Sequence, residues 1–328
     1  MLRISAGLLV GILAASAALT SAAPMPAAQA QDFPSRPVTM VVPYGAGSPA
    51  DVIGRLIAQG MSTQLGQQVL VENVGGAGGV TGVNRVAKAS PDGYQFVQGG
   101  TGTHAQSQTL YKNPPYNAVA DFTPLALITE SPLVLVARKD YPADDLKGVA
   151  AQAKAKEATY GSAGVGSSTH LGCEMLAQAM GAKMTHVPYR GMPQALTDVT
   201  GGQIDCVFAD PASAQGLVQD GKLRALAVTS AKRLETMPEL PTIAESGLPG
   251  YELTAWVGVF VRAKTPAEII ARLNTLVTGF VNSAEAKKYL TTIGATPFPS
   301  TPQELAAFQE ADTRRWAEIV ATAKIEKK

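Results

Sequence analysis

The chain has 328 residues, of which 46% are hydrophobic, and carries 27 Lys and Arg residues against 26 Asp and Glu residues. This balance argues against nucleic acid as a partner, because neutralising phosphates requires clustered Lys and Arg. It does not suggest an anionic membrane surface either. The length allows two lobes of ordinary domain size, each with its own core.

The N-terminus has the organisation of a secretory signal peptide. Arg3 supplies a positive charge, an apolar run extends from Leu8 to Leu19, and Ala28-Gln29-Ala30 precedes Gln31. A membrane anchor is the alternative, but the run is shorter than the roughly 20 residues that span a bilayer. We therefore expect cleavage after Ala30 and export across the cytoplasmic membrane.

Strands and helices then alternate, which favours an α/β fold with largely parallel sheets. The first series has strands at Val38–Val42, Val69–Val71 and Tyr94–Val97 and helices at Pro49–Leu65 and Val80–Ala89. The second series has strands at Leu133–Ala137, Tyr160–Ser162, His186–Pro188, Asp205–Phe208 and Leu223–Val228 and helices at Leu146–Lys156, His170–Met180 and Pro193–Thr200. A strand at Trp256–Val261 and two or three amphipathic helices complete the chain.

Three segments have the pattern of a helix start with a capping box and Pro at the first helical position. They begin at Ser48, Thr265 and Thr301. At the first of them, Ser48 is the expected N-cap, and Asp51 is expected to fold back onto the Ser48 amide.

No segment reads as a clean linker between two domains, so we expect one lobe to be interrupted by the other. The predicted organisation is a signal peptide at residues 1–30, a first lobe at 31–131 and 229–328, and a second lobe at 132–228. The chain is expected to leave the first lobe near Leu125–Pro132.

Five loops that follow predicted strands carry glycines, hydroxyls or charged side chains. The first is Gly45–Asp51, where the free amides of a helix N-terminus would attract an anion. A G-x-G-x-x-A pattern there also resembles a dinucleotide site with Glu72 as the ribose acid, but a nicotinamide cofactor does not suit an exported protein.

The other four loops lie further along the chain, and ordinary turn chemistry is the alternative explanation for each. Their candidate residues are Thr101, Thr103 and His104 in the second loop, Ser162, Gly164, Ser167, Thr169 and His170 in the third, Tyr189 and Arg190 in the fourth, and Asp210 in the fifth. Strand ends in two lobes point to one shared crevice, so the five loops together predict a carboxylate-binding cleft.

Enzymatic and metal sites have little support in the sequence. There is no G-x-S-x-G motif for a serine hydrolase and no H-E-x-x-H or Cys-x-x-Cys for a metal. Cys173 and Cys206 are expected to be buried thiols, although export would permit a disulfide. We predict no cofactor, no metal and no catalytic residue.

The motifs together resemble the Bug family of periplasmic binding proteins, the extracytoplasmic receptors of tripartite tricarboxylate transporters. The resemblance covers essentially the whole chain after the signal peptide. The matching stretches are Phe33–Val38, Val42–Gly47 with Asp51, Val71–Asn73, Gly76–Gly79, Pro91–Tyr94, Gly102–Ala105, Gly164–Leu171, His186–Tyr189 with Gly191, Leu223–Thr229 and Gly247–Glu252.

The resemblance implies a type II periplasmic-binding-protein fold, with two lobes and a hinge, located in the periplasm. It implies a monomer that binds an aliphatic, amino-acid or aromatic mono- or dicarboxylate in a largely uncharged pocket and delivers it to the membrane components of a transporter. The site residues that it implies are Tyr44, Ala46, Ser48, Ala50 and Asp51 in the first lobe and Ser162, Ser167, Thr169, Tyr189 and Asp210 in the second.

Two positions depart from the family pattern. Gly47-Ser48-Pro49 stands where Gly-Gly is common, which removes an amide donor and adds a hydroxyl, and Arg190 stands where Lys is common. Arg190 either pairs with a second ligand carboxylate or faces solvent. Ligand-driven hinge closure is the expected mechanism; a sensory receptor of the same fold and, less favoured, a secreted serine hydrolase are the alternatives.

Overall fold

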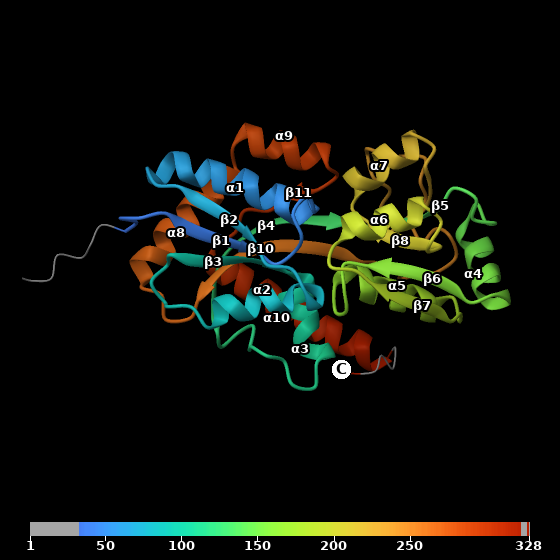
Figure 1. Ribbon diagram of the computed structural model, residues 1–328, viewed down its shortest axis with the longest axis horizontal. Coiled ribbons are helices and arrows are strands. Elements are labelled where there is room, and N and C mark those ends of the chain that lie inside the picture. Colours follow the sequence, from blue (N-terminus) through green and yellow to red (C-terminus); the bar gives the residue numbers. More distant parts are fainter. Residues whose placement is uncertain (1–32, 323–326, 328) are drawn as a thin grey trace, which may run out of the picture. The chain divides into compact units, whose positions relative to one another are not determined.

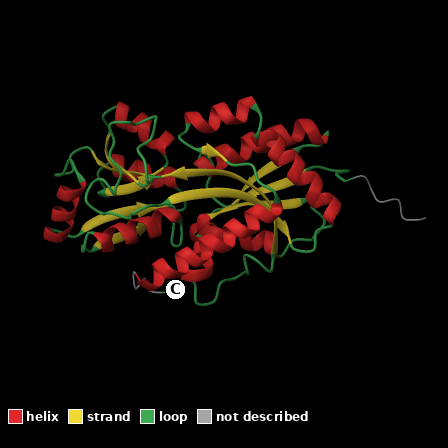
Figure 2. Ribbon diagram, turned by 180° about the vertical axis from the view of Figure 1, so that it is seen from behind, coloured by secondary structure: helices red, strands yellow, loops and turns green. Residues whose placement is uncertain are grey.

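The computed structural model describes residues 33–322 and Lys327, so the predicted signal peptide lies outside the described residues. Among them are two mixed sheets, each flanked by helices (Figures 1 and 2). The first sheet has the order β11-β4-β10-β3-β1-β2 and the second β7-β6-β8-β5-β9. No helix of this part of the chain is both long enough and apolar enough to cross a membrane.

The first sheet is parallel at one edge, where β1 pairs with β2 and β3, and antiparallel beyond β3. Its strands are β1 (Val38–Val42), β2 (Val69–Asn73), β3 (Gln95–Gly100), β4 (Phe122–Pro132), β10 (Thr254–Arg262) and β11 (Thr296–Pro297). The predicted continuous apolar run forms β1, which is buried on both faces, as expected of a strand paired on both sides.

The second sheet is parallel where β6 pairs with β7 and β8, and antiparallel where β5 pairs with β8 and β9. Its strands are β5 (Val134–Arg138), β6 (Ala158–Ser162), β7 (Met184–Pro188), β8 (Cys206–Ala209) and β9 (Leu223–Val228). All five lie within the segment predicted as the second lobe, whose boundaries stay a prediction.

Helices cover both faces of each sheet (Figure 1). Those beside the first sheet are α1 (Pro49–Leu65), α2 (Val80–Ala87), α3 (Ser107–Leu110), α8 (Ala267–Val281), α9 (Ala284–Thr292) and α10 (Pro302–Thr322). Those beside the second are α4 (Leu146–Ala155), α5 (Ser168–Ala179), α6 (Met192–Thr200) and α7 (Pro211–Gln219). A 3₁₀ turn, Ala77–Gly79, and a π-helical segment, Thr101–Gln106, lie in loops that follow β2 and β3.

The predicted exit from the first lobe near Leu125–Pro132 is part of the eleven-residue strand β4. Pro124 lies near the start of this strand and donates no ladder hydrogen bond. The register shifts beside it, since Val259 pairs with Ala126 and Phe260 with Pro124. The irregularity accommodates the Pro and allows the strand to continue.

The capping predictions have mixed outcomes. At Thr301 the box forms, with the Thr301 amide donating to Glu304 Oε2 at 2.7 Å and the Glu304 amide donating to Thr301 Oγ1 at 3.2 Å. At Thr265 it does not form, because α8 begins at Ala267 after Pro266 and the Thr265 hydroxyl donates to the Arg262 carbonyl instead. Cys173 and Cys206 are buried free thiols, as expected.

Candidate functional site

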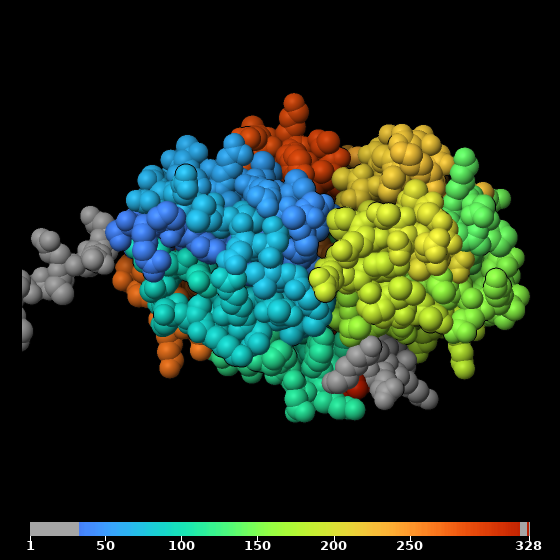
Figure 3. Space-filling view, viewed as in Figure 1, coloured from blue at the N-terminus to red at the C-terminus, as the bar shows by residue number. Residues whose placement is uncertain are grey.

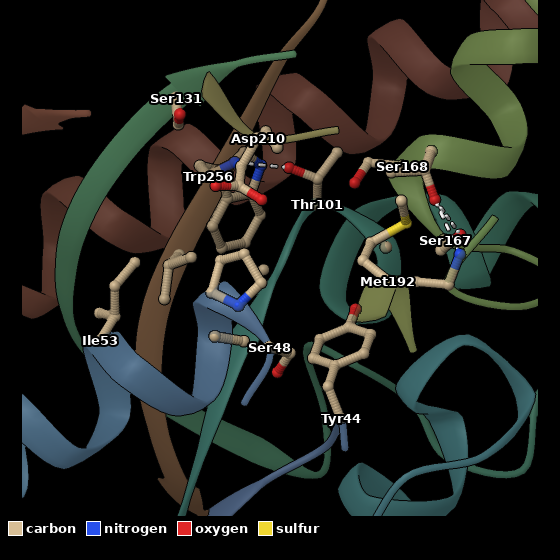
Figure 4. A pocket seen from close by; sticks show the side chains of 18 of the residues that line it. Tyr44, Ser48, Ile53, Thr101, Ser131, Ser167, Ser168, Met192, Asp210 and Trp256 are labelled. Carbon is tan, nitrogen blue, oxygen red and sulfur yellow. Dashed lines mark hydrogen bonds between the residues drawn. The ribbon is translucent and has the colours of Figure 1, made fainter. Parts of the chain in front are cut away.

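A cavity of about 150 Å³ lies between the two sheets and is lined by residues of both. Ser48, Ile53 and Trp256 come from the side of the first sheet, and Ser167, Ser168, Met192 and Asp210 from the side of the second (Figure 4). Within the described residues, the lining includes no Lys, Arg or His. An anion here would therefore be bound by amides and hydroxyls.

The N-terminus of α1 forms one wall of the cavity. Ser48 is the N-cap, and its Oγ accepts a hydrogen bond from the Asp51 amide at 3.3 Å, as predicted. Pro49 has no amide hydrogen, and the Ala50 amide donates to no other described residue. Ala50 therefore presents a free donor to the cavity at the positive end of the helix dipole.

Asp51 does not fold back onto Ser48 as predicted, because its carboxylate accepts the Gly47 amide at 2.9 Å. It also accepts hydrogen bonds from Arg55 at 3.1 Å and from the Asn73 amide group at 2.9 Å. Burial alone would raise the pKa of Asp51, but these hydrogen bonds and the Arg55 charge hold it below its ordinary value. Asp51 is therefore an anionic support of the loop, not part of the cavity lining.

The opposite wall is the N-terminus of α5. Ser167 is the N-cap, accepting the His170 amide at 3.2 Å and donating to the Gly164 carbonyl at 2.7 Å. The Thr169 hydroxyl accepts the Ala163 amide at 3.0 Å. The amides of Ser168 and Thr169 donate to no other described residue, so a second helix start offers free donors to the cavity.

Asp210 is the N-cap of α7, a helix that the sequence analysis did not identify. Its Oδ1 accepts the Ser213 amide at 2.9 Å, whereas its buried Oδ2 has no hydrogen-bond partner among the described residues. Burial raises the pKa of this carboxyl despite the opposing hydrogen bonds from Ser213 and Ala212. The sequence does carry a signal for this helix: Asp210 is a favoured N-cap residue, and Pro211 follows it in the first turn, where Pro is tolerated.

Thr101 and Tyr44 complete the polar lining on the side of the first sheet. Thr101 Oγ1 accepts the backbone amide of Trp256 at 2.8 Å, so its own proton remains available (Figure 4). The Tyr44 hydroxyl donates to the Gly78 carbonyl at 3.4 Å, and burial raises the pKa of Tyr44 to about 12. Tyr44 is therefore a neutral hydroxyl at physiological pH.

Backbone segments of the two sides meet beside the cavity, and Figure 3 shows their atoms meeting along a seam. A Cβ added to Gly78 would lie 2.3 Å from the Val165 carbonyl oxygen, and one on Gly164 would lie 2.9 Å from the Gly78 amide. One on Gly102 would lie 3.3 Å from the Gly166 carbonyl oxygen. Glycines therefore permit this close approach.

The structure brings seven of the predicted residues together in the cavity lining: Tyr44, Ser48, Ala50, Thr101, Ser167, Thr169 and Asp210. Others lie outside it: Ala46 and Arg190 are exposed, Gly164 is in the seam, and the Tyr189 hydroxyl donates to Asp198 at 2.6 Å. Of the two alternatives given for Arg190, its position agrees with the one in which it faces solvent. Contact between any of these residues and a ligand stays a prediction.

Thr103 and His104 belong to the core beneath the cavity. The His104 ring is fully buried and stacks on Phe260, with 3.8 Å between ring centroids, and Thr103 Oγ1 lies 3.0 Å from His104 Nδ1. Burial lowers the pKa of His104 to about 3. A neutral core histidine explains the position better than a ligand contact.

Ser162 and His170 form a layer behind the α5 loop. Ser162 Oγ lies 2.6 Å from His186 Nε2, and the rings of His170 and His186 are 4.1 Å apart. A serine beside a histidine resembles part of a hydrolytic triad. Ser162 is 0% exposed and absent from the cavity lining, so the pair is not positioned to attack a ligand.

Several lining residues were missed by the sequence analysis. They are Ile53, Gln98, Ser131, Ser168, Met192 and Trp256 among others. Trp256 begins a predicted strand and Gln98 directly follows one; the alternation of a strand identifies its two faces but not which residues pack against them. The Trp256 indole nitrogen donates to Asp312 at 2.7 Å, which fixes the ring beside the cavity.

The comparisons with known proteins agree with this architecture. A family model described as the tripartite tricarboxylate transporter family receptor matches residues 53–325. The solved structure of the periplasmic binding protein BugD is similar with a TM-score of 0.87 and 35% identity, covering 90% of this chain and 100% of that one.

Two similar structures contain ligands named in their descriptions. A protein of R. palustris with adipate has a TM-score of 0.86 and 36% identity, covering 90% of this chain and 99% of that one. MatC from Rhodopseudomonas palustris with bound malate has a TM-score of 0.83 and 35% identity, covering 88% of this chain and 100% of that one. Both named ligands are dicarboxylates.

Proposed function

The chain belongs to the tripartite tricarboxylate transporter receptor family, a family of solute-binding proteins and not of enzymes, and on that premise we propose that it binds a small organic mono- or dicarboxylate between its two lobes in the periplasm. The bound ligand would be aliphatic, aromatic or an amino acid. The closed protein would then deliver it, as a monomer, to the membrane components of a tripartite transporter.

One observation supports the proposal most directly: helix N-termini from both sides converge on a cavity whose described lining residues include no cationic side chain. Ala50 on α1 and Ser168 and Thr169 on α5 have free amides there. Amides at helix starts favour negative charge, each helix contributing about 0.3–1 kcal/mol and up to ~2 kcal/mol in partly buried geometry. A carboxylate suits these donors, because its oxygens accept from several amides and hydroxyls.

Binding would stabilise the closed arrangement only if the ligand contacts both sides. Ser48 and Thr101 belong to one side of the cavity, and Thr169 and Asp210 to the other. A ligand spanning these residues has contacts in the closed form that the open form lacks. This differential affinity is what would drive hinge closure.

The proposal is tested by a thermal-shift screen of aliphatic, aromatic and amino-acid carboxylates, from butyrate and benzoate to malate and adipate. Ligand at ~100 Kd stabilises the folded state by about 2.7 kcal/mol, which is a readable shift. X-ray scattering with the best ligand should show a smaller radius of gyration. No shift with any carboxylate, or an unchanged radius at saturation, would contradict the proposal.

A further inference from the structure

Gln98 is a buried side chain of the cavity lining whose hydrogen-bonding groups are both unused. It lies on β3 and is 2% exposed. Neither Oε1 nor Nε2 has a hydrogen-bond partner among the described residues. A buried amide without partners is unfavourable, so this side chain points to a complementary group in the cavity.

None of the described residues around Gln98 offers a substitute partner. A Cβ added to Gly54 of α1 would lie 3.1 Å from Gln98 Oε1 and 2.7 Å from Val42 Cγ2, so the helix backbone packs closely against it. Ile53 is buried and lines the same cavity. Gln98 is thus a polar group in largely apolar surroundings, where an unpaired amide is least tolerated.

Asp210 affects which ligand charge the cavity can accommodate. Its Oδ2 is buried and unpartnered, and within the described residues the lining contains no Lys, Arg or His. A ligand with two ionised carboxylates would bring a second negative charge into the cavity without a counterion. A second group that is uncharged avoids this cost.

Resting on the proposed function, we infer that the ligand is a monoanion whose second polar group is neutral, both donates and accepts hydrogen bonds as a carboxamide does, and pairs with Gln98. The carboxylate takes the free amides at the helix starts. The carboxamide donates to Gln98 Oε1 and accepts from Nε2, which satisfies both groups at once.

The test compares dicarboxylates with their monoamides by calorimetry, using succinate with succinamate, glutarate with glutaramate and adipate with adipamate. In the wild type, the monoamide of the best-fitting length should bind at least roughly tenfold more tightly than its dicarboxylate. Gln98→Met keeps the length of the side chain and removes the amide. It should abolish this preference.

Gln95→Met is the matched control, because Gln95 lies on the same strand but outside the cavity lining. It should keep the preference. Ligand-free Gln98→Met should unfold at the same urea concentration as the wild type or a higher one, since an unpaired buried amide has been replaced by an apolar group.

The inference is overturned if a dicarboxylate binds as tightly as its monoamide, or if Gln98→Met retains the preference. Either result leaves the proposed function standing, because a carboxylate still binds. Absence of binding by every monocarboxylate, dicarboxylate and monoamide would overturn both.

Discussion

Thr229 and Leu133 are joined by two reciprocal hydrogen bonds at the point where the chain passes between the sheets. The Leu133 amide donates to Thr229 Oγ1 at 2.7 Å, and the Thr229 amide donates to the Leu133 carbonyl at 2.8 Å. The same hydroxyl donates to the Leu253 carbonyl at 2.6 Å, and Thr229 is 0% exposed. One side chain thus links the connection from β4 to β5 with both ends of the connection from β9 to β10.

Thr229→Val should destabilise the protein, because it keeps the shape of the side chain and removes the hydroxyl. The buried Leu133 amide loses its acceptor and the Leu253 carbonyl loses this donor, at about 1–3 kcal/mol for each unsatisfied group. Urea denaturation measures the loss. Thr229→Ser keeps the hydroxyl and should retain most of the stability; equal losses in both variants would contradict the role given to the hydroxyl.

Gly78→Ala should weaken ligand binding without removing any ligand contact. The added methyl group meets the Val165 carbonyl oxygen only while the two sides of the seam are in contact, so it opposes the closed form. We expect the Kd to rise at least roughly tenfold, since a clash of about 1.4 kcal/mol already has that effect. Calorimetry gives the Kd, and scattering should show incomplete compaction at saturating ligand.

Gly66→Ala is the matched control for backbone strain. Gly66 has φ +67° against +63° for Gly78, and a Cβ there meets nothing within 4 Å. Both variants should lose a similar amount of intrinsic stability through the left-handed conformation. Only Gly78→Ala should lose affinity; comparable binding losses would attribute the effect to strain.

The fold could be predicted to a large extent from the sequence because its signals are local. The apolar run Val38–Val42 is a buried strand, and Ser48-Pro49 starts α1 at the predicted residue. Strand β4 was not predicted, because it contains Pro124, and Pro is uncommon inside a strand that is paired on both sides. The family resemblance drawn from the loop motifs is confirmed by the family match.

The site was harder to predict because a cavity depends on which residues meet across the seam. The helix start at Ser48 carries its own capping signal and was predicted, whereas Ser167 was predicted as a site residue and the helix that it caps was expected to begin at His170. Gln98 directly follows the predicted strand Tyr94–Val97, and nothing in the sequence marks its amide as unpaired; its missing partner is seen only where α1 packs against it. His104 was a candidate by residue type, whereas burial against Phe260 makes it part of the core.

Asp51→Asn should destabilise the loop before α1 at neutral pH. The variant loses a carboxylate that accepts from Gly47, Arg55 and Asn73, and hydrogen bonds to a charged group contribute about 1.5–3 kcal/mol. The folded state lowers the pKa of Asp51, so this stabilisation is present above the unfolded pKa of about 3.9 and is lost as the pH falls below it. The difference in urea stability between wild type and variant should therefore shrink at acid pH.

Asp220→Asn provides the comparison for a surface ion pair. Asp220 lies 2.9 Å from Lys222, and both side chains are more than half exposed. Such pairs contribute at most about 1 kcal/mol. An Asp51→Asn loss no larger than this one, or one that persists unchanged at acid pH, would contradict the support role of Asp51.

His104 should make the folded protein less stable as the pH falls below neutrality. Its pKa is about 3 in the folded state because of burial, whereas an unfolded histidine titrates near 6.5, so only the unfolded chain takes up this proton in between. Each pH unit below about 6.5 then lowers the free energy of unfolding by up to about 1.4 kcal/mol.

Since carboxylates also titrate toward acid pH, the test compares the pH dependence of stability in the wild type with that in His104→Asn, whose side chain does not titrate in this range. Between pH 7 and about pH 4.5 the variant should lose about 2–3 kcal/mol less in urea denaturation; parallel slopes would mean that His104 takes up its proton while folded.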